Sequence, residues 1–191
     1  MKTFIDKFNE ISTVTKTMTI VCIFFYLLGI FSLIVNPMII DGLNLDISGF
    51  SYSTLYEVFT YPFVHNFHPS HLMFNLALLI LFGSVLEKEI EVKNYLVLIV
   101  FGWIFNFLPM MFLGNDKEIM GLSGIVISII TFNLFVSKKT SNSVKFLGFV
   151  YFMDSFLKFD FLTNMSVFGH VMSILGGLLF VIIYKTKKVT F

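Results

Sequence analysis

Six long apolar runs, separated by polar connections, limit what this 191-residue chain can fold into. Lipid cannot satisfy exposed backbone groups, and crossing a bilayer core takes about 20 apolar residues in a helix. The runs cover residues 18–35, 71–86, 95–113, 122–136, 144–157 and 167–184. They predict an all-α membrane protein, a six-transmembrane-helix bundle in a single domain that occupies residues 1–191.

The composition supports this class and argues against two others. The chain is 57% hydrophobic and its mean hydropathy is +0.88, far above that of an ordinary soluble domain. Its net charge of +1, without any arginine, gives no indication of a nucleic-acid partner. Cys22 is the only cysteine and lies in an apolar run, so one chain cannot build a disulfide framework or a thiolate metal cluster. The lipid bilayer is therefore the expected surrounding.

The lysines predict the orientation. Eleven of the thirteen fall on one side of the predicted bundle, and only Lys117 and Lys158 fall on the other. The positive-inside rule then places both termini in the cytoplasm, as a short segment 1–17 and a tail 185–191. The first apolar run lacks a small-residue cleavage pattern, which predicts a retained helix; a cleaved signal peptide is the alternative. The lysine-only, Phe- and Ile-rich composition suggests a bacterial plasma membrane.

A long segment, residues 36–70, separates the first two runs and is too polar to span. Its aromatic residues include Phe50, Tyr52, Phe59, Tyr61, Phe63 and Phe67. Aromatic side chains favour the boundary between lipid and water. The segment is expected to form a long interfacial first external loop.

Polar residues collect at the external starts of the even-numbered runs. His71 and Asn75 are four residues apart and share one helix face. Ser123 opens the fourth run, and His170 lies within the first turns of the sixth. Polar groups inside membrane segments are costly and count as functional candidates.

Ser123 has the surroundings of a nucleophile. Its run of about 15 residues covers only about 23 Å of a core about 30 Å thick, so its start is expected below the external surface, in a wet indentation. Gly121 and Gly124 permit tight turns and close approach, and the free amides of a helix N-terminus stabilise an anion. With His170 as a proton acceptor, these are the parts of an acyl-transfer site.

The combination resembles the rhomboid intramembrane serine proteases over almost the whole chain. The shared features are His-x-x-x-Asn from His71 to Asn75, Gly-x-Ser-Gly around Ser123, and Gly-His ending at His170, each on its expected helix. The resemblance implies a six-helix rhomboid-like fold, with Ser123 as nucleophile and His170 as general base. It further implies an oxyanion hole formed by His71, Asn75 and the Ser123 amide, transmembrane proteins as substrates, and no metal or organic cofactor.

Other residues are expected to support this site. Small residues at Ser173 and Gly177 lie on the His170 face, where the sixth helix can pack on the fourth. Rhomboids usually carry glycine where Ser173 stands, and many carry tyrosine where this chain has Ile127. An aliphatic side chain there supports the histidine by packing but offers it no aromatic face.

Features outside the polar cluster also resemble the family. The stretch TYPFVH, residues 60–65, looks like the family's approach to the second helix, and Gly83 with Glu87 looks like its cytoplasmic exit. Many members have Trp-Arg just before the threonine, whereas Tyr56 and Glu57 stand here, so the loop is expected to be anchored differently.

Each candidate also has a structural alternative. Ser123 alone is consistent with capping or close packing, His170 with a bond to a carbonyl, and His71 and Asn75 with interhelical hydrogen bonds. His65, His68 and His71 lie within seven residues and raise the alternative of a metal site, although His65 is expected to support the loop.

Three polar residues in other runs are assigned structural roles. Asp154 is expected to mark an early end of the fifth helix, with a role in substrate entry as its alternative. Asn106 and Asn133 are expected to form interhelical hydrogen bonds.

The functional prediction has two rivals. One is a non-catalytic rhomboid-like protein that binds transmembrane helices without cutting them. The other is a small transporter or channel, which would thread ionisable residues through the bilayer rather than gather them near one face.

Overall fold

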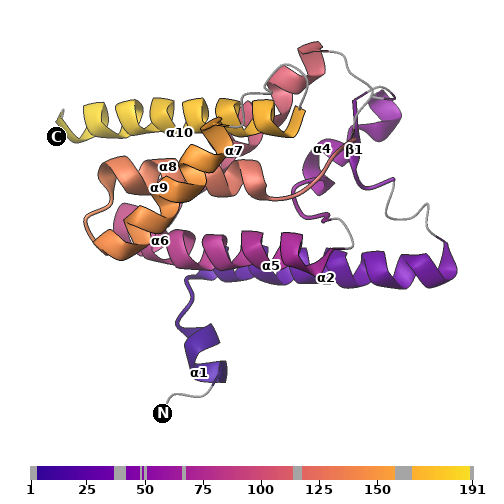
Figure 1. The fold of residues 1–191 in the computed structure, drawn as a ribbon, viewed down its shortest axis with the longest axis horizontal. Helices are drawn as coiled ribbons and strands as arrows, with labels where there is room; N and C mark the ends of the chain where they lie inside the picture. Colours follow the sequence, from indigo (N-terminus) through magenta and orange to yellow (C-terminus); the bar gives the residue numbers. More distant parts are fainter. Residues whose placement is uncertain are drawn as a thin grey trace.

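The computed structural model describes residues 4–36, 42–47, 49, 51–65, 68–113, 118–157 and 165–189, and it is mostly helical (Figure 1). Each of the six predicted apolar runs coincides with helical structure. The elements are α1 (Phe4–Asn9), α2 (Thr13–Val35), β1 (Leu45–Asp46), η1 (Tyr52–Thr54), α4 (Glu57–Thr60), α5 (Pro69–Leu78), η2 (Leu79–Gly83), α6 (Ser84–Ile90), α7 (Val92–Leu113), β2 (Glu118–Ile119), α8 (Ser123–Val136), α9 (Asn142–Leu157) and α10 (Met165–Val189). Phe50, Phe67, Lys117 and Lys158 lie outside the described residues, as does the side chain of Asp154.

Three helical stretches in the described part are long and apolar enough to cross a membrane. They are Thr13–Val35, Pro69–Ile90 and Phe168–Thr186, and Val92–Leu108 and Ser123–Val136 are shorter apolar helices. Large apolar side chains of α2, such as Phe24, Phe31 and Ile34, are exposed. An exposed apolar surface of this extent suits a protein whose surroundings are lipid.

α8 lies at the centre of the bundle, between α10 and the stretch that runs from α5 to α6 (Figure 1). Every residue from Gly124 to Asn133 is buried. Other helices rather than lipid therefore surround most of α8, and this position tolerates a helix too short to span the hydrocarbon core by itself.

The stretch from α5 to α6 is one continuous rod interrupted by the π-helical turn η2. A π turn shifts the backbone hydrogen-bond register and leaves carbonyl groups open to other donors. The Asn133 side chain of α8 donates to the Phe82 carbonyl oxygen within this turn, at 3.4 Å. The expected interhelical role of Asn133 is thus observed.

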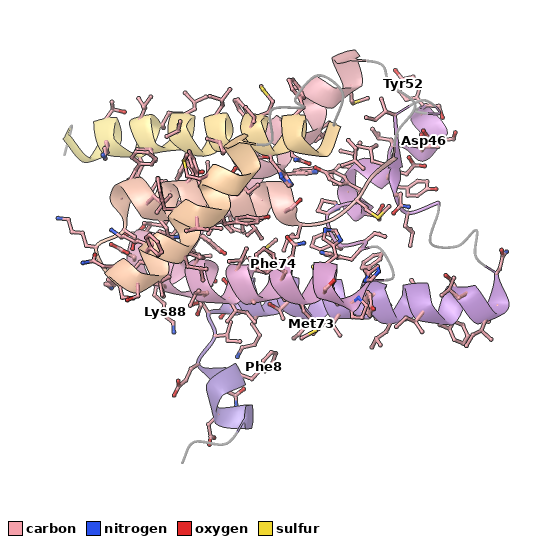
Figure 2. All side chains as sticks on the ribbon, in the orientation of Figure 1. Phe8, Asp46, Tyr52, Met73, Phe74 and Lys88 are labelled. Carbon is pink, nitrogen blue, oxygen red and sulfur yellow. The ribbon has the colours of Figure 1, made fainter. Side chains whose placement is uncertain are left out.

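The segment before α5 packs on α7 rather than extending away from the bundle. Leu45 pairs with Ile119 across the antiparallel β1–β2 ladder, and both join a buried cluster with Tyr61 and Val58. The Trp103 indole on α7 donates to the Val58 carbonyl oxygen at 2.9 Å. Figure 2 places Asp46 and Tyr52 of this segment at one end of the molecule, and Lys88 of α6 towards the other.

At the α6 end, a buried carboxylate joins α6 to the start of α2. Glu87 accepts hydrogen bonds from the backbone amides of Val14 and Thr15, at 2.9 and 3.0 Å, and from the Thr15 hydroxyl at 3.0 Å. Thr15 also contacts the Tyr95 hydroxyl at 3.1 Å. A carboxylate that receives the first amides of a helix satisfies groups without intrahelical partners and complements the helix dipole.

Candidate active site

Ser123 and His170 meet across two helices. Ser123 is the first residue of α8 and His170 lies in the second turn of α10, and both are partly buried. The Ser123 hydroxyl lies 2.9 Å from His170 Nε2, so the two groups share a hydrogen bond. This is the separation at which an imidazole can accept a proton from a serine hydroxyl.

The turn before Ser123 requires glycine. Gly121 has a φ of +98°, a backbone conformation that L side chains rarely adopt, and its amide donates to the Tyr61 carbonyl oxygen at 2.8 Å. A Cβ at this position would lie 3.0 Å from Cε1 of His71. The glycine therefore allows the chain to reverse into α8 and allows the His71 ring to approach the turn.

The start of α8 also presents unpaired backbone donors. The first N–H groups of an α-helix have no intrahelical acceptor. In α8 these groups belong to Ser123, Gly124 and Ile125. The Val126 amide is the one that bonds back to the Leu122 carbonyl, at 3.0 Å. The Ser123 amide thus belongs to a group of donors suited to an anion.

His71 and Asn75 follow one another on α5, beside this turn. The Asn75 side-chain amide donates to the His71 carbonyl oxygen at 3.0 Å, and Asn75 is only 2% exposed. Asn75 Oδ1 and His71 Nδ1 are buried without a hydrogen-bond partner among the described residues. His71 thus approaches the Gly121 turn directly, while the Asn75 amide is engaged with its own helix.

His65 is a further member of the cluster. Its ring is 3% exposed and lies 5.2 Å from the His71 ring between centroids, and its Nδ1 contacts the Phe63 carbonyl oxygen at 3.1 Å. Burial, with a smaller contribution from neighbouring His71, lowers the pKa of His65 from 6.5 to about 4, and the bond to Phe63 opposes this shift. The neutral imidazole of His65 therefore packs beside the His71 ring. In the sequence, the spacing of His65, His68 and His71 within seven residues was the feature that pointed to His65.

The metal-site alternative required three histidines together. The structure pairs His65 with His71 and leaves His68 exposed at the start of α5. Within the described ranges, no group of three or more His, Cys, Asp or Glu side chains is placed to hold a metal ion.

Behind the Ser123–His170 pair, a polar network joins α7 to α10. The Asn106 amide donates to the Ser173 hydroxyl at 3.3 Å, and the Tyr61 hydroxyl donates to Asn106 Oδ1, also at 3.3 Å. The Ser173 hydroxyl in turn donates to the Gly169 carbonyl oxygen at 2.8 Å. Asn106 has the interhelical role expected of it, and Ser173 supplies a partner that a glycine would lack.

Close packing explains two of the other predicted positions. A Cβ on Gly124 would lie 2.4 Å from Nδ2 of Asn106, so α8 approaches this side chain as closely as a backbone allows. A Cβ on Gly177 would lie 3.0 Å from the Ser128 carbonyl oxygen, which places α10 directly against α8. Gly177 thus brings together the two helices that carry Ser123 and His170, and Gly124 brings α8 against α7.

The two departures from the family pattern are both accommodated in the structure. Ile127 is 1% exposed on α8, one turn after Ser123. Glu57 is 5% exposed, and its carboxylate accepts the Asp46 amide at 3.1 Å, which ties α4 to β1. Tyr56, by contrast, is exposed. The loop is therefore anchored through the buried carboxylate of Glu57 rather than through Tyr56.

Comparison with protein families gives one finding. The family model described as the rhomboid domain matches residues 52–187, from the start of η1 almost to the end of α10. A comparison with curated proteins gives no match.

Proposed function

The chain belongs to the rhomboid family, and from this premise we propose that it is an intramembrane serine endopeptidase that hydrolyses peptide bonds in or next to transmembrane segments of other proteins. The observation that carries the proposal is the 2.9 Å contact between the Ser123 hydroxyl and His170 Nε2. Families of this kind are usually proteases, and this contact supplies the reacting pair that such chemistry requires.

In the proposed mechanism the Ser123 oxygen attacks the carbonyl carbon of the scissile bond. His170 accepts the hydroxyl proton at Nε2 and returns it to the nitrogen of the leaving amine, which leaves an acyl group on Ser123. A water molecule then attacks the ester and transfers its proton through His170, and the second product leaves with Ser123 restored. The pair acts without the carboxylate of a three-residue triad.

The negative charge that develops on the carbonyl oxygen needs donors. The Ser123 amide at the start of α8 and the side chains of His71 and Asn75 are proposed for this role. Each such donor is worth about 3 to 4 kcal/mol of transition-state stabilisation in enzymes where one has been removed. The buried, unpartnered Nδ1 of His71 supports the proposal, because such groups are rare where nothing binds to them. The Asn75 amide uses one N–H in its bond to the His71 carbonyl oxygen and has a second N–H to donate.

The proposed substrate region is a transmembrane helix that unwinds locally. A helical peptide engages its carbonyl groups in intrachain hydrogen bonds, so a scissile bond must leave the helix before it is attacked. Partial burial of Ser123 and His170 suits a site that a segment enters from lipid while water still reaches the pair.

We place the protein in the membrane with six spans and with both termini in the cytoplasm, in a bacterial plasma membrane. The lysine distribution supports this orientation, because eleven of the thirteen lysines then lie on the cytoplasmic side. The pair would accordingly lie towards the external face.

The deciding experiment is cleavage of a reporter transmembrane substrate in liposomes. The unaltered chain is expected to cut, and Ser123→Ala and His170→Ala, folded to equal helical content, are expected to lose cleavage by at least about a thousandfold. Ser143→Ala is the matched control, because Ser143 is an exposed serine near the start of α9.

A second readout separates catalysis from binding. A serine-directed fluorophosphonate probe is expected to label the unaltered chain and the Ser143→Ala control, but neither of the two dyad variants. If no variant cuts a diverse panel of substrate helices, the probe labels none, and all of them bind the helices equally, the protein is the non-catalytic helix-binding member instead.

A further inference from the structure

A hollow of about 540 Å³ opens at the end of the bundle opposite Ser123, between the ends of α6, α8 and α10. Its walls are largely apolar and include Ile90, Phe135 and Tyr184, while Lys138 and Lys185 stand at its edge. Figure 1 shows α6, the connection from α8 to α9 and the C-terminal end of α10 at this end of the molecule. The hollow thus combines an apolar wall with two cations.

The two cations are available to a ligand. Both lysines are exposed, and neither ammonium group donates a hydrogen bond to the part of the chain that the structure describes. Lys145 differs, because its ammonium donates to the Ser137 carbonyl oxygen at 2.5 Å. Within the described residues, no hydrogen-bond acceptor therefore engages the ammonium groups of Lys138 and Lys185.

The one acidic residue at the hollow is already engaged. Glu89 accepts the Ser137 hydroxyl at 2.5 Å and the Lys138 amide at 2.7 Å. These bonds hold the backbone of Lys138 beside α6 and occupy the carboxylate oxygens. The hollow consequently favours an anion over a cation.

The hollow also lies where an apolar core ends. α8 ends at Val136, two residues before Lys138, and the apolar stretch of α10 ends at Thr186, next to Lys185. Lysines at the ends of membrane helices lie at the level of lipid headgroups. The Phe135 side chain, which lines the hollow, is 52% exposed.

We propose that this hollow binds an anionic glycerophospholipid of the leaflet that faces the termini. Lys138 and Lys185 hold the phosphate, and an acyl chain lies against Phe135. The proposal rests on the membrane placement given above but not on catalysis. Because Lys138 follows α8 and Lys185 belongs to α10, the bound phosphate links the far ends of the two helices that carry Ser123 and His170.

The test measures lipid retained by the purified full-length chain in a neutral detergent, by native mass spectrometry. Phosphatidylglycerol is expected to bind saturably, and phosphatidylcholine and soluble glycerol phosphate at least about tenfold more weakly, because the first lacks net charge and the second lacks chains. A lysine near a lipid surface contributes about fivefold to affinity, so Lys138→Gln/Lys185→Gln is expected to lose about 30-fold.

The matched control removes the same charge elsewhere on the same side. Lys88→Gln/Lys93→Gln replaces two exposed lysines that do not line the hollow, and it is expected to change phosphatidylglycerol binding by less than about threefold. An equal loss in this control would assign the binding to diffuse charge and overturn the site. Equal binding of glycerol phosphate would make it a phosphate-ester site rather than a lipid site and overturn the proposal too.

Catalysis is separated from lipid binding by one further variant. Ser123→Ala is expected to bind phosphatidylglycerol as tightly as the unaltered chain, since Ser123 lies at the other end of α8. Absence of saturable binding in both forms would end the lipid proposal while leaving the protease proposal to its own assay.

Discussion

The two ends of the helix bundle differ in whether their buried polar groups have hydrogen-bond partners. At the α6 end, both oxygens of the buried Glu87 carboxylate accept hydrogen bonds, and Thr15 and Tyr95 complete the network. Around Ser123, the buried atoms His65 Nε2, His71 Nδ1 and Asn75 Oδ1 have no partner among the described residues. Nothing comparable is left unpaired at the α6 end within the described ranges.

This contrast separates a structural network from a site prepared for a ligand. A satisfied buried network stabilises the fold, whereas an unsatisfied group costs about 1 to 3 kcal/mol unless a water or a ligand pairs with it. The end of the bundle that carries Ser123 has this energetic cost, beside the proposed reacting pair. Variants at the two ends should therefore affect different quantities, activity at one and stability at the other.

The largest expected effect is on turnover, from variants at the end of the bundle that carries Ser123. Asn75→Ala and His71→Ala each remove a proposed oxyanion donor, so each is expected to lower kcat by about 10² to 10³-fold. Neither change breaks a satisfied interhelical network, so the melting temperature in detergent should shift little. Steady-state cleavage in liposomes measures the first quantity and thermal unfolding the second.

His68→Ala is the control for these variants, because His68 is an exposed histidine at the start of α5. It should leave both kcat and the melting temperature unchanged. If His71→Ala kept full turnover but melted at a much lower temperature, the polar groups around Ser123 would be structural and the contrast between the ends would fail.

The next effect concerns pH. Because burial lowers the pKa of His65 from 6.5 to about 4, the unfolded chain binds this proton more readily than the folded one. The contribution to stability is complete above about pH 6.5 and is lost as the pH falls towards 4, by about 3 kcal/mol in all. Cleavage should fall in acid as well, because His170 must be neutral to accept the Ser123 proton.

His65→Asn separates the two acid effects. The variant should flatten the dependence of unfolding free energy on pH between about 6.5 and 4, measured by denaturant titration at each pH. The acid loss of cleavage should persist in it, because His170 is unchanged. A stability profile that remained as steep as in the unaltered chain would assign the acid sensitivity to other groups.

At the α6 end the expected effect is on stability alone. Glu87→Gln places an amide nitrogen where one carboxylate oxygen now accepts a bond, so it faces a donor and loses charge-assisted hydrogen bonds. The unfolding free energy should fall by about 2 kcal/mol while kcat stays within about twofold. Glu91→Gln, at an exposed position just after α6, should change neither.

Much of the fold could be predicted from the sequence, because the apolar runs determine where the helices lie. All six predicted runs coincide with helices, and the small residues at Gly124 and Gly177 mark close helix packing. The continuation of the second run through the π turn η2 was not predictable, because a π turn depends on tertiary contacts such as that between Asn133 and Phe82. The packing of the segment before α5 on α7 likewise depends on Trp103 and Leu45, which are far apart in the chain.

For the candidate site, the sequence predicts which polar residues gather near the start of α8, but not all of the contacts between them. Helix periodicity places His71 and Asn75 on one face, and the apolar runs place Ser123 and His170 at similar depths. The spacing of three histidines within seven residues indicated a cluster that includes His65. The packing of the His65 ring against His71 alone was not predicted, because it depends on how the chain turns between Phe63 and α5. The Asn106–Ser173 bond was hidden for the same reason, since it joins residues 67 positions apart.

The smallest expected effect comes from Ser173, which lies between the polar groups around Ser123 and the fully hydrogen-bonded interior of the bundle. Ser173 is fully buried one turn after His170, and its hydroxyl receives the Asn106 amide while it donates to Gly169. Ser173→Gly restores the residue that rhomboids usually carry here, but it leaves the Asn106 amide without this acceptor and places a glycine inside α10. The unfolding free energy should fall by about 1 kcal/mol, measured by thermal unfolding, and kcat should stay within about twofold. Ser173→Ala keeps the helix propensity and removes only the hydroxyl, so it isolates the hydrogen-bond contribution. A tenfold loss of kcat in both variants would instead make Ser173 a positioning residue for His170, and the region that supports catalysis would extend from the helix starts into the satisfied interior.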